Sequence, residues 1–320
     1  MENAPRPNQD RLSRDGRGPT LRIALLVIVA GLVIAAGGWF AFRAMSAAPA
    51  NEQRAIAARE HRSQEETVAP LPEPEEEAPA PAAPAPGASS EPDVTGKPFI
   101  DRFDTPGLSS RWFVSDGWSN GPWMANDWRA SEVELTPQGL ALHLREGRPG
   151  SRFELAGAEI RTLDFYRYGY FEIRMKVPRD PGVLIGVFTY ADRAGKVRPN
   201  EIDIEILGRS TRVAELTIHE NGRATHKKIA LPFDSAEDFH TYGFDWQPEY
   251  VRWYIDGRLV HEETGTAARR LVRPQQFIVS VWATRELSAW AGKLDVSRAP
   301  WRMDVSCVAQ AAAYSGPICS

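Results

Sequence analysis

The sequence after residue 98 predicts an all-β fold, a β-sandwich or jelly roll of antiparallel strands. Apolar and polar residues alternate with a period of two over residues 140–144 and 171–177, as in strands with one buried face. Asp256 and Gly257 separate two strand-like runs, and this pair favours a two-residue hairpin turn because both positions tolerate positive φ. Helical periodicity is nearly absent here, and a region of about 210 residues can bury one substantial core.

The N-terminal part predicts a membrane anchor. Residues 23–42 are apolar and uncharged, and as a helix they would span roughly 30 Å, the hydrocarbon thickness of a bilayer. Five arginines precede this stretch and only Arg43 follows it closely, so the positive-inside rule makes residues 1–22 a cytoplasmic tail. The expected protein is single-pass in the inner membrane, with the rest of the chain in the periplasm or outside. A cleaved and secreted form is the alternative, because small residues such as Ala48 and Ala50 follow the apolar stretch.

Residues 43–98 predict a disordered linker rich in Pro, Ala and Glu. Ten of the 25 prolines lie between Pro49 and Pro98, and such a segment has too little apolar surface to offset the entropy of ordering it. A proline-rich recognition ligand is the alternative interpretation. The resulting organisation is a folded domain at 99–309, where any chemistry must reside, followed by a C-terminal tail at 310–320.

Composition excludes several classes of function. Lys and Arg total 38 against 42 Asp and Glu, for a net charge of -4, and no basic block suggests a nucleic-acid partner. The two cysteines, Cys307 and Cys319, are too few for a four-cysteine zinc site, and whether they pair is left open. Nine of the ten tryptophans follow the linker, and exposed indoles suit the flat apolar faces of sugars.

Residues 117–121 match the G-x-S-x-G pattern of a serine-hydrolase nucleophile elbow. That elbow requires a strand that turns sharply into a helix. Here Pro122, Trp123 and further strand-like sequence follow, so we expect Ser119 to lie in a loop and not to act as a nucleophile.

A run of alternating acidic residues is the stronger candidate for chemistry. In a strand over residues 201–207, Glu201, Asp203 and Glu205 share one face and the intervening isoleucines enter the core. Like charges about 7 Å apart repel, which raises the pKa of at least one carboxyl and leaves an acid beside a base. Retaining glycoside hydrolysis uses such a pair, provided that the strand bends or bulges enough to bring the two glutamates together. A solvated acidic strand or a calcium site is the alternative.

The acidic run and several other segments resemble glycoside hydrolase family 16, especially bacterial lichenases and the exopolysaccharide-depolymerising glycanases of rhizobia. The resemblance covers residues 103–308, and it implies a jelly-roll sandwich of two antiparallel sheets with a concave substrate cleft. It rests on the segments DGWSNG, WRA, AEIRT, YGYFEIRMK, EIDIEILG and FHTYGFDWQPEYVRWYIDG.

The resemblance implies a role for each matching residue. Glu201 would be the nucleophile, Glu205 the general acid/base, and Asp203 the partner that tunes their protonation. No cofactor would be required, and Asp304 would hold a structural Ca²⁺, unless it is a plain surface aspartate. The residues that would line the sugar subsites are Asn120, Glu159, Arg161, Tyr190, Trp282 and Trp290. The tryptophans could instead pack in the core, and Glu159 and Arg161 could form a structural ion pair.

The sequence also departs from the lichenase pattern. Pro199 and Asn200 replace a tryptophan and an aspartate, and Ser280 replaces an asparagine, so we do not expect strict specificity for lichenan. Asn126 and Gly157 stand where lichenases have two paired cysteines. The expected function is a retaining endo-β-glycanase acting on a polysaccharide, either a β-glucan or a bacterial exopolysaccharide. A transglycosylase and a non-catalytic sugar-binding jelly roll are the alternatives.

Overall fold

The computed structural model describes residues 91–191 and 200–320. The predicted cytoplasmic tail, membrane anchor and most of the linker lie outside the described residues. Within the described parts of the chain, none of the helices has the length and apolar character needed to cross a bilayer.

The first sheet carries the acidic run on its middle strands. Apart from β3, its strands pair antiparallel. Across the sheet the order is β11 (Arg223–Ala230), β10 (Val213–Glu220), β9 (Asn200–Leu207), β8 (Val183–Ala191), β15 (Gln276–Ala283) and β6 (Leu155–Thr162), with β2 (Trp112–Val114) and the parallel β3 (Asn126–Trp128) on β6.

The second sheet packs behind the first and is joined to it by a short pairing between β5 and β6. Its order is β5 (Gly139–Glu146), β16 (Trp301–Ala311), β7 (Gly169–Lys176), β12 (His240–Gln247), β13 (Tyr250–Ile255) and β14 (Arg258–Glu263), with β4 (Val133–Thr136) on β5 and β1 (Phe99–Asp101) on β16.

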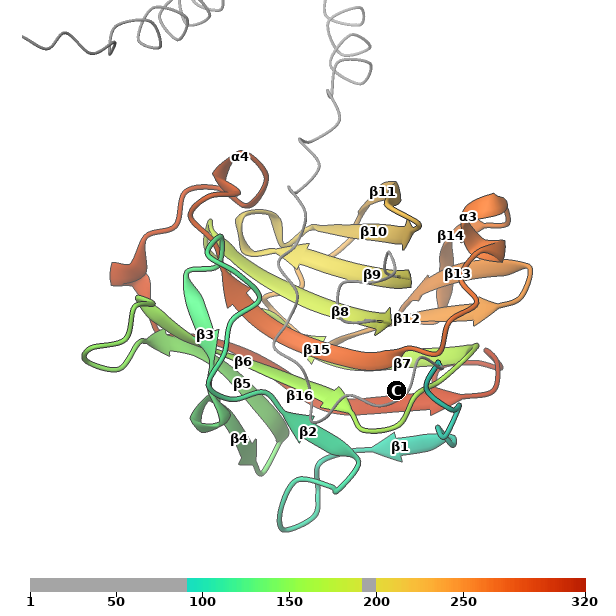
Figure 1. The fold of residues 1–320 in the computed structure, drawn as a ribbon, viewed down its shortest axis with the longest axis horizontal. Helices are drawn as coiled ribbons and strands as arrows, with labels where there is room; N and C mark the ends of the chain where they lie inside the picture. Colours follow the sequence, from blue (N-terminus) through green and yellow to red (C-terminus); the bar gives the residue numbers. More distant parts are fainter. Residues whose placement is uncertain (1–90, 192–199) are drawn as a thin grey trace, which may run out of the picture. The chain divides into compact units, whose positions relative to one another are not determined.

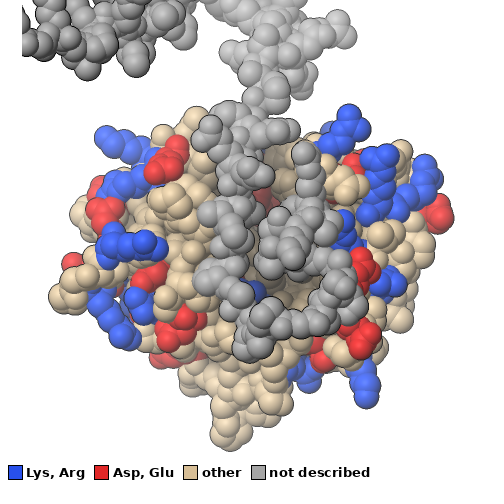
Figure 2. Space-filling view, in the orientation of Figure 1, with Lys and Arg blue, Asp and Glu red and all other residues tan. Residues whose placement is uncertain are grey.

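The helices are short, and α3 and α4 lie at opposite ends of the view in Figure 1. Figure 2 shows Lys and Arg side chains interspersed with Asp and Glu on both flanks of the same view. The helical elements are α3 (Thr266–Arg269), α4 (Ser288–Ala291) and the 3₁₀ turns η1 (Ala130–Glu132), η2 (Gly208–Ser210) and η3 (Val296–Arg298).

The core lies between the two sheets and confirms the predicted sandwich. Ile202, Ile204 and Ile206 of β9 are all buried on the inner face of the first sheet. They belong to the same apolar cluster as Phe171 and Phe244, which the second sheet contributes from β7 and β12. Burial of one face per sheet is what the alternating sequence pattern predicts.

The predicted hairpin turn is confirmed between β13 and β14. Asp256 has φ 47° and Gly257 has φ 72°, so both turn positions are in the left-handed region. The carboxylate of Asp256 also accepts a hydrogen bond from the backbone N–H of Thr241 at 2.9 Å, which ties the turn to β12.

The segment that precedes the first strand of the sandwich and the segment that follows the last one are both attached to it. The backbone N–H groups of Thr95 and Gly96 donate to the carbonyl of Phe165, so the last residues of the predicted linker contact the body. At the other end, Cys307 of β16 forms a disulfide with Cys319. The segment predicted as a C-terminal tail is thereby fixed against the second sheet.

Candidate active site

The three acidic residues of β9 lie on one face of the first sheet. Glu201 and Glu205 are half-buried, whereas Asp203 is only 5 % exposed. The isoleucines between them point into the core, so the carboxyl groups occupy the outer face, away from the second sheet. The predicted shared face of the acidic run is therefore confirmed.

Glu205 has the electrostatic character of a general acid. Burial, and next the negative charge of Glu215, raise the pKa of Glu205 from 4.5 to about 8. Glu215 is the direct cross-strand neighbour of Glu205 on β10, whereas the neighbour on β8 is Gly186, which has no side chain. The carboxyl group of Glu205 consequently stays protonated at neutral pH.

Asp203 lies beside an imidazole as well as beside the two glutamates. Nε2 of His219 is 3.7 Å from a carboxylate oxygen of Asp203, and burial lowers the pKa of His219. Polar side-chain atoms of Glu201, Asp203 and His219 lie within 4.8 Å of one another. Calcium takes about six to eight oxygen ligands, so two carboxylates and a ring nitrogen suit proton handling better than calcium binding.

A polar network contributed by β10, β11 and α4 surrounds Glu215, which is itself 3 % exposed. Nζ of Lys228 lies 2.9 Å from Oε1 of Glu215, and Nε1–H of Trp290 donates to Oε2 at 3.0 Å. Nε2 of His226 is 3.3 Å from the same Oε2, while its Nδ1 bonds the Thr217 hydroxyl at 3.1 Å. Donors on both oxygens suit an ionised carboxylate, which can only accept hydrogen bonds.

Glu159 and Arg161 form the ion pair that was the alternative to sugar binding. The guanidinium of Arg161 is 2.7 Å from Oε1 of Glu159, which also accepts from the Ser115 hydroxyl at 2.5 Å. The same guanidinium lies 5.2 Å from the ring centre of Trp118. The pair lies on β6. In the first sheet, β8 and β15 separate β6 from β9.

Asn120 lies in a loop, as does the serine of the G-x-S-x-G match. The side-chain oxygen of Asn120 accepts from Nε1–H of Trp128 at 2.9 Å, which fixes the orientation of its amide. The Ser119 hydroxyl donates to the carbonyl of Asn126 at 2.9 Å. Strand β3 follows this loop, so the strand-to-helix turn of a nucleophile elbow is absent from this described segment.

Three half-buried indoles form a row near the acidic residues. The ring centres of Trp282 and Trp290 are 6.3 Å apart, and Trp123 packs edge-on against Trp282 at 5.2 Å. Trp282 lies on β15, and Trp290 lies on α4, where its indole N–H reaches Glu215. The predicted pair of tryptophans is thus extended by Trp123, a residue that the sequence did not single out.

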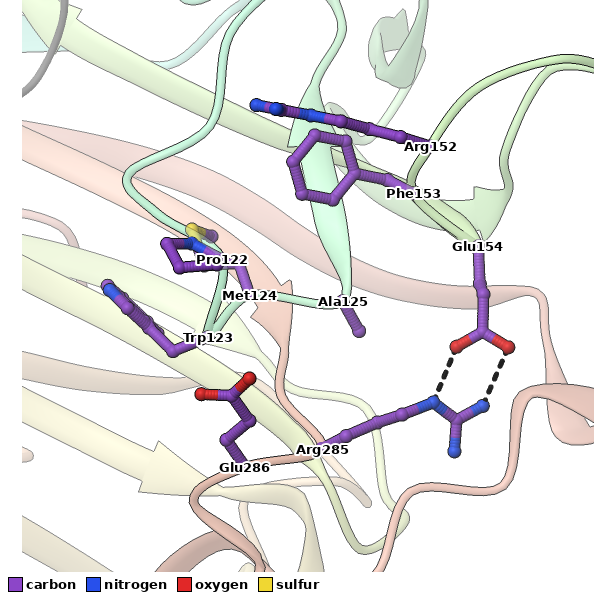
Figure 3. Close-up of a pocket in the computed structure, with 9 residues that line it drawn as sticks. All are labelled: Pro122, Trp123, Met124, Ala125, Arg152, Phe153, Glu154, Arg285 and Glu286. Atoms are coloured by element: carbon purple, nitrogen blue, oxygen red, sulfur yellow. Dashed lines mark hydrogen bonds and ion pairs between the residues drawn. The ribbon is translucent and has the colours of Figure 1, made fainter. Parts of the chain in front are cut away.

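A pocket of about 140 Å³ adjoins this row, because Trp123 is one of the residues that line it. Figure 3 shows Arg285 paired with Glu154 at this pocket and Arg152 over the ring of Phe153. Nε of Arg285 is 2.5 Å from a carboxylate oxygen of Glu154. The three acidic residues of β9 are not among those that line the pocket. It can therefore contact only a distal part of an extended ligand.

Further positions that the sequence singled out lie on β9 itself, on its neighbour β8, or on β15 beside β8. Tyr190 is the cross-strand partner of Glu201, and Ser280 pairs with Gly186. Asn200 is buried, and its side-chain oxygen accepts from the backbone N–H groups of Val272 and Arg273. Pro199 lies outside the described residues.

Asp304 lies on the second sheet, away from the acidic run. One of its oxygens is 2.5 Å from the guanidinium of Arg302, and the other is 3.7 Å from Nζ of Lys176. Both oxygens thus face positive charges, which favours the surface-aspartate interpretation. Binding of Ca²⁺ by Asp304 stays a prediction.

Several residues at the site were not predicted from the sequence. Glu215, Thr217 and His219 alternate with buried apolar residues along β10, so a period-two pattern in residues 213–220 marks them as sharing a face. The sequence does not reveal that this strand pairs with β9, in a register that sets Glu215 beside Glu205. The pairing is needed to recognise the network.

Comparison with known proteins agrees with this geometry. The family model described as glycosyl hydrolases family 16 matches residues 120–300. A β-glucanase of Bacillus subtilis is 35% identical over 200 residues, covering 62% of this chain and 80% of that protein. A xylanase/β-glucanase of Ruminococcus flavefaciens is 35% identical over 205 residues, and the chain spans only 25% of that longer protein.

The solved structures include a close match to the described sandwich. The crystal structure of a β-1,3-1,4-glucanase (lichenase) from a mouse hindgut metagenome superimposes with a TM-score of 0.63 at 32% identity, covering 68% of this chain and 100% of that chain. The family model spans more than half of the sequence, and the sandwich and acidic strand agree with it. The chain therefore belongs to the glycosyl hydrolases of family 16 and is a glycoside hydrolase that resembles the lichenases.

Proposed function

We propose that the protein is a retaining endo-β-glycanase that hydrolyses internal β-glycosidic bonds of a β-glucan or a bacterial exopolysaccharide. The observation that carries this proposal is the raised pKa of Glu205 on a face that it shares with Glu201 and Asp203. A protonated carboxyl beside other acidic groups is the combination that retaining glycoside hydrolysis requires.

In the proposed mechanism the two glutamates act in succession. The carboxylate of Glu201 attacks the anomeric carbon while Glu205 protonates the departing glycosidic oxygen, which produces a covalent glycosyl-enzyme. Glu205, now a carboxylate, then takes a proton from a water molecule that attacks the anomeric carbon and releases Glu201. Asp203 lies between the two on the same face and, by its charge, modulates the protonation of both.

The proposed substrate is a long sugar chain that extends across the first sheet. The indole row and the polar groups of Asn120 and Arg161 provide apolar faces and hydrogen-bonding groups suited to successive sugar rings, while the buried Glu159 holds the guanidinium of Arg161 in place. The names of the relatives, β-glucanase and lichenase, support a β-glucan. The replaced positions Asn200 and Ser280 support a preference that differs from theirs.

We also propose that the protein is anchored in the inner membrane through residues 23–42, with the catalytic domain exported. The length and charge flanks of that segment support the anchor. The Cys307–Cys319 disulfide supports an oxidising compartment. Full-length protein should pellet with membranes and resist extraction at high pH, and recovery in the soluble fraction without proteolysis would contradict the anchor.

The proposed activity is tested by incubating the protein with a panel of β-glucans and exopolysaccharides and analysing the fragments by mass spectrometry. We expect internal cleavage of at least one polymer, and Glu201→Gln should keep polymer binding while losing turnover by about 10³-fold or more. Unchanged turnover of Glu201→Gln would contradict its assignment as nucleophile. Products longer than the starting oligosaccharide would favour a transglycosylase, and binding without any cleavage would favour a sugar-binding jelly roll.

A further inference from the structure

A second buried glutamate lies beside the proposed acid and has no part in the mechanism above. Glu215 is 3 % exposed and is the cross-strand neighbour of Glu205, with its side chain on the same outer face. Directly opposed residues on one face of an antiparallel pair have Cβ atoms about 5 Å apart. A buried negative charge at that distance disfavours ionisation of its neighbour.

The network around Glu215 keeps the charge on Glu215 and away from Glu205. The ammonium of Lys228 and the indole N–H of Trp290 bond its two oxygens, and the ring of His226 lies against one of them. Burial lowers the pKa of His226, so the ring is neutral at neutral pH and can donate from Nε2 while Nδ1 accepts from Thr217. One carboxylate is thus held ionised beside another that is protonated.

We propose that Glu215 is a positioning residue that holds Glu205 in its protonated form and so sets the upper pH limit of catalysis. The inference rests on the proposed role of Glu205 as general acid. Glu215 would thus be a determinant of the acid strength of Glu205 that lies on the neighbouring strand β10. It is distinct from Asp203, which lies on β9 together with Glu205. Trp290 connects it to the indole row, because the indole that donates to Glu215 also packs near Trp282.

The other groups that face Glu205 from neighbouring elements do not supply this function. On β8 and β15 the adjacent residues are Gly186 and Ser280, which carry no charge. Among the described residues, the titratable or charged groups on this face near Glu205 are Tyr190 on β8, Glu201 and Asp203 on β9, Glu215 and His219 on β10, and His226 and Lys228 on β11.

The test compares the pH dependence of kcat/KM for wild type, Glu215→Gln and Lys228→Met on the natural polymer. In Glu215→Gln we expect the alkaline limb of the kcat/KM profile to move to lower pH by about one unit. At pH values above the limb, kcat/KM should be roughly tenfold lower than in the wild type. Near pH 6 it should differ by about twofold or less. The limb should still lie above the ordinary range for glutamate, because burial of Glu205 persists. Lys228→Met should move the limb upward, because loss of the cation favours protonation of the Glu205–Glu215 pair.

Matched variants separate this effect from general disturbance of the strands. Glu220→Gln removes an equally buried carboxylate from the other face of β10, where it pairs with Arg270, and Lys227→Met removes the lysine adjacent to Lys228. Both should leave the alkaline limb in place. An alkaline limb that does not move in folded Glu215→Gln would overturn the inference. If Glu215→Gln does not fold, Lys228→Met provides the test, because Lys228 is half-exposed and tolerates replacement. An alkaline limb that stays in place or moves to lower pH in Lys228→Met would then overturn the inference.

A second substrate distinguishes a role in proton donation from a merely structural role. An aryl glycoside with a strongly acidic phenol as leaving group needs little protonation by Glu205 in the first step. Its glycosylation rate should be about the same in Glu215→Gln and wild type at alkaline pH, whereas the polymer should show the loss. Equal losses on both substrates would overturn the inference while leaving the proposed hydrolase activity intact, since that activity is judged on the wild-type protein.

Discussion

Glu205 shows how one residue type takes two forms on one sheet. Glu205 and Glu215 are both glutamates on the outer face of neighbouring strands, yet only Glu215 is bonded by an ammonium and an indole N–H. Charge-assisted hydrogen bonds stabilise the ionised form, whereas burial next to a negative charge destabilises it. The difference in partners therefore separates a fixed carboxylate from an acid.

Replacement of Glu205 should change stability in a pH-dependent way. In the native state the carboxyl has a pKa of about 8, against 4.5 for an ordinary glutamate, so between these values the unfolded chain binds fewer protons than the native protein. Stability of the wild type therefore falls as pH rises through this range. Because glutamine has no such dependence, the melting temperature of Glu205→Gln relative to wild type should rise from pH 4.5 to 8 and then level off.

The measurement is thermal unfolding of both proteins across this pH range. Values at about pH 3.5 and below serve as the internal reference, because there position 205 is essentially uncharged in both proteins, in the unfolded as well as the native state. A difference in melting temperature that stays constant with pH would contradict the raised pKa of Glu205.

At this scale the sequence predicted which residues share a face but not what they touch. Alternation alone assigns Glu201, Asp203 and Glu205 to one side of β9, because successive side chains of a strand point in opposite directions. Contacts such as Asp203 with His219 depend on which strand pairs with β9 and in which register. Strand pairing is not encoded in the local pattern, so those contacts could not be predicted.

Among the elements, β3 and β6 carry the two positions, Asn126 and Gly157, at which the resemblance to lichenases implies a disulfide. This chain has neither cysteine, and a different contact joins the strands there. Asn126 of β3 lies against Gly157 of β6, where a Cβ would approach the Asn126 amide to 2.4 Å. The Asn126 side-chain oxygen also accepts from the backbone N–H of Ala283 on β15 at 2.9 Å. The buried amide of Asn126 thus packs against β6 and accepts a hydrogen bond from the backbone of β15. The sequence identified the two positions but not this bond.

The disulfide between Cys307 and Cys319 should contribute to the stability of the C-terminal element. The cysteines are 12 residues apart in sequence, and a loop of that length corresponds to about 3 kcal/mol of unfolding free energy. The double variant Cys307→Ser/Cys319→Ser should lose this amount in denaturant unfolding. Its kcat should be unchanged, because β16 belongs to the second sheet.

Reduction of the wild-type disulfide serves as the control. It should lower the unfolding midpoint to that of the double variant and should have no effect on the variant itself. An unfolding midpoint of the wild type that does not respond to the reductant would show that the bridge contributes nothing.

Trp123 should matter for long substrates only. It belongs both to the indole row and to the lining of the distal pocket, so a polymer that reaches the pocket would contact its ring. Trp123→Ala should raise KM for the polymer about fivefold, equivalent to about 1 kcal/mol, and leave kcat within about twofold. KM for a short oligosaccharide that does not reach Trp123 should be unchanged.

Leu259→Ala, at a half-exposed apolar residue of β14 on the second sheet, is the control and should leave KM unaltered for both substrates. Equal losses on short and long substrates in Trp123→Ala would mean that the indole supports the fold or the reaction centre and not the distal chain.

For the whole molecule, much of the fold was predictable because each of the two sheets buries one face in a shared core. The second sheet supplies the opposite wall of the core, and the first sheet exposes a polar outer face with the acidic run on β9. Period-two patterning, the Asp256-Gly257 turn and the length of the region specify such a sandwich. The order of strands was not predictable, because neighbours such as β6 and β15 are more than 100 residues apart.

The central claim is that Glu201 and Glu205 act in succession on one glycosidic bond, by double displacement. Each displacement inverts the anomeric carbon, so two displacements return it to its starting configuration. Proton NMR during the first minutes of cleavage, before mutarotation, reads this directly from the newly formed reducing end. The account predicts that the β-anomer appears first and the α-anomer only later, whereas initial appearance of the α-anomer would contradict it.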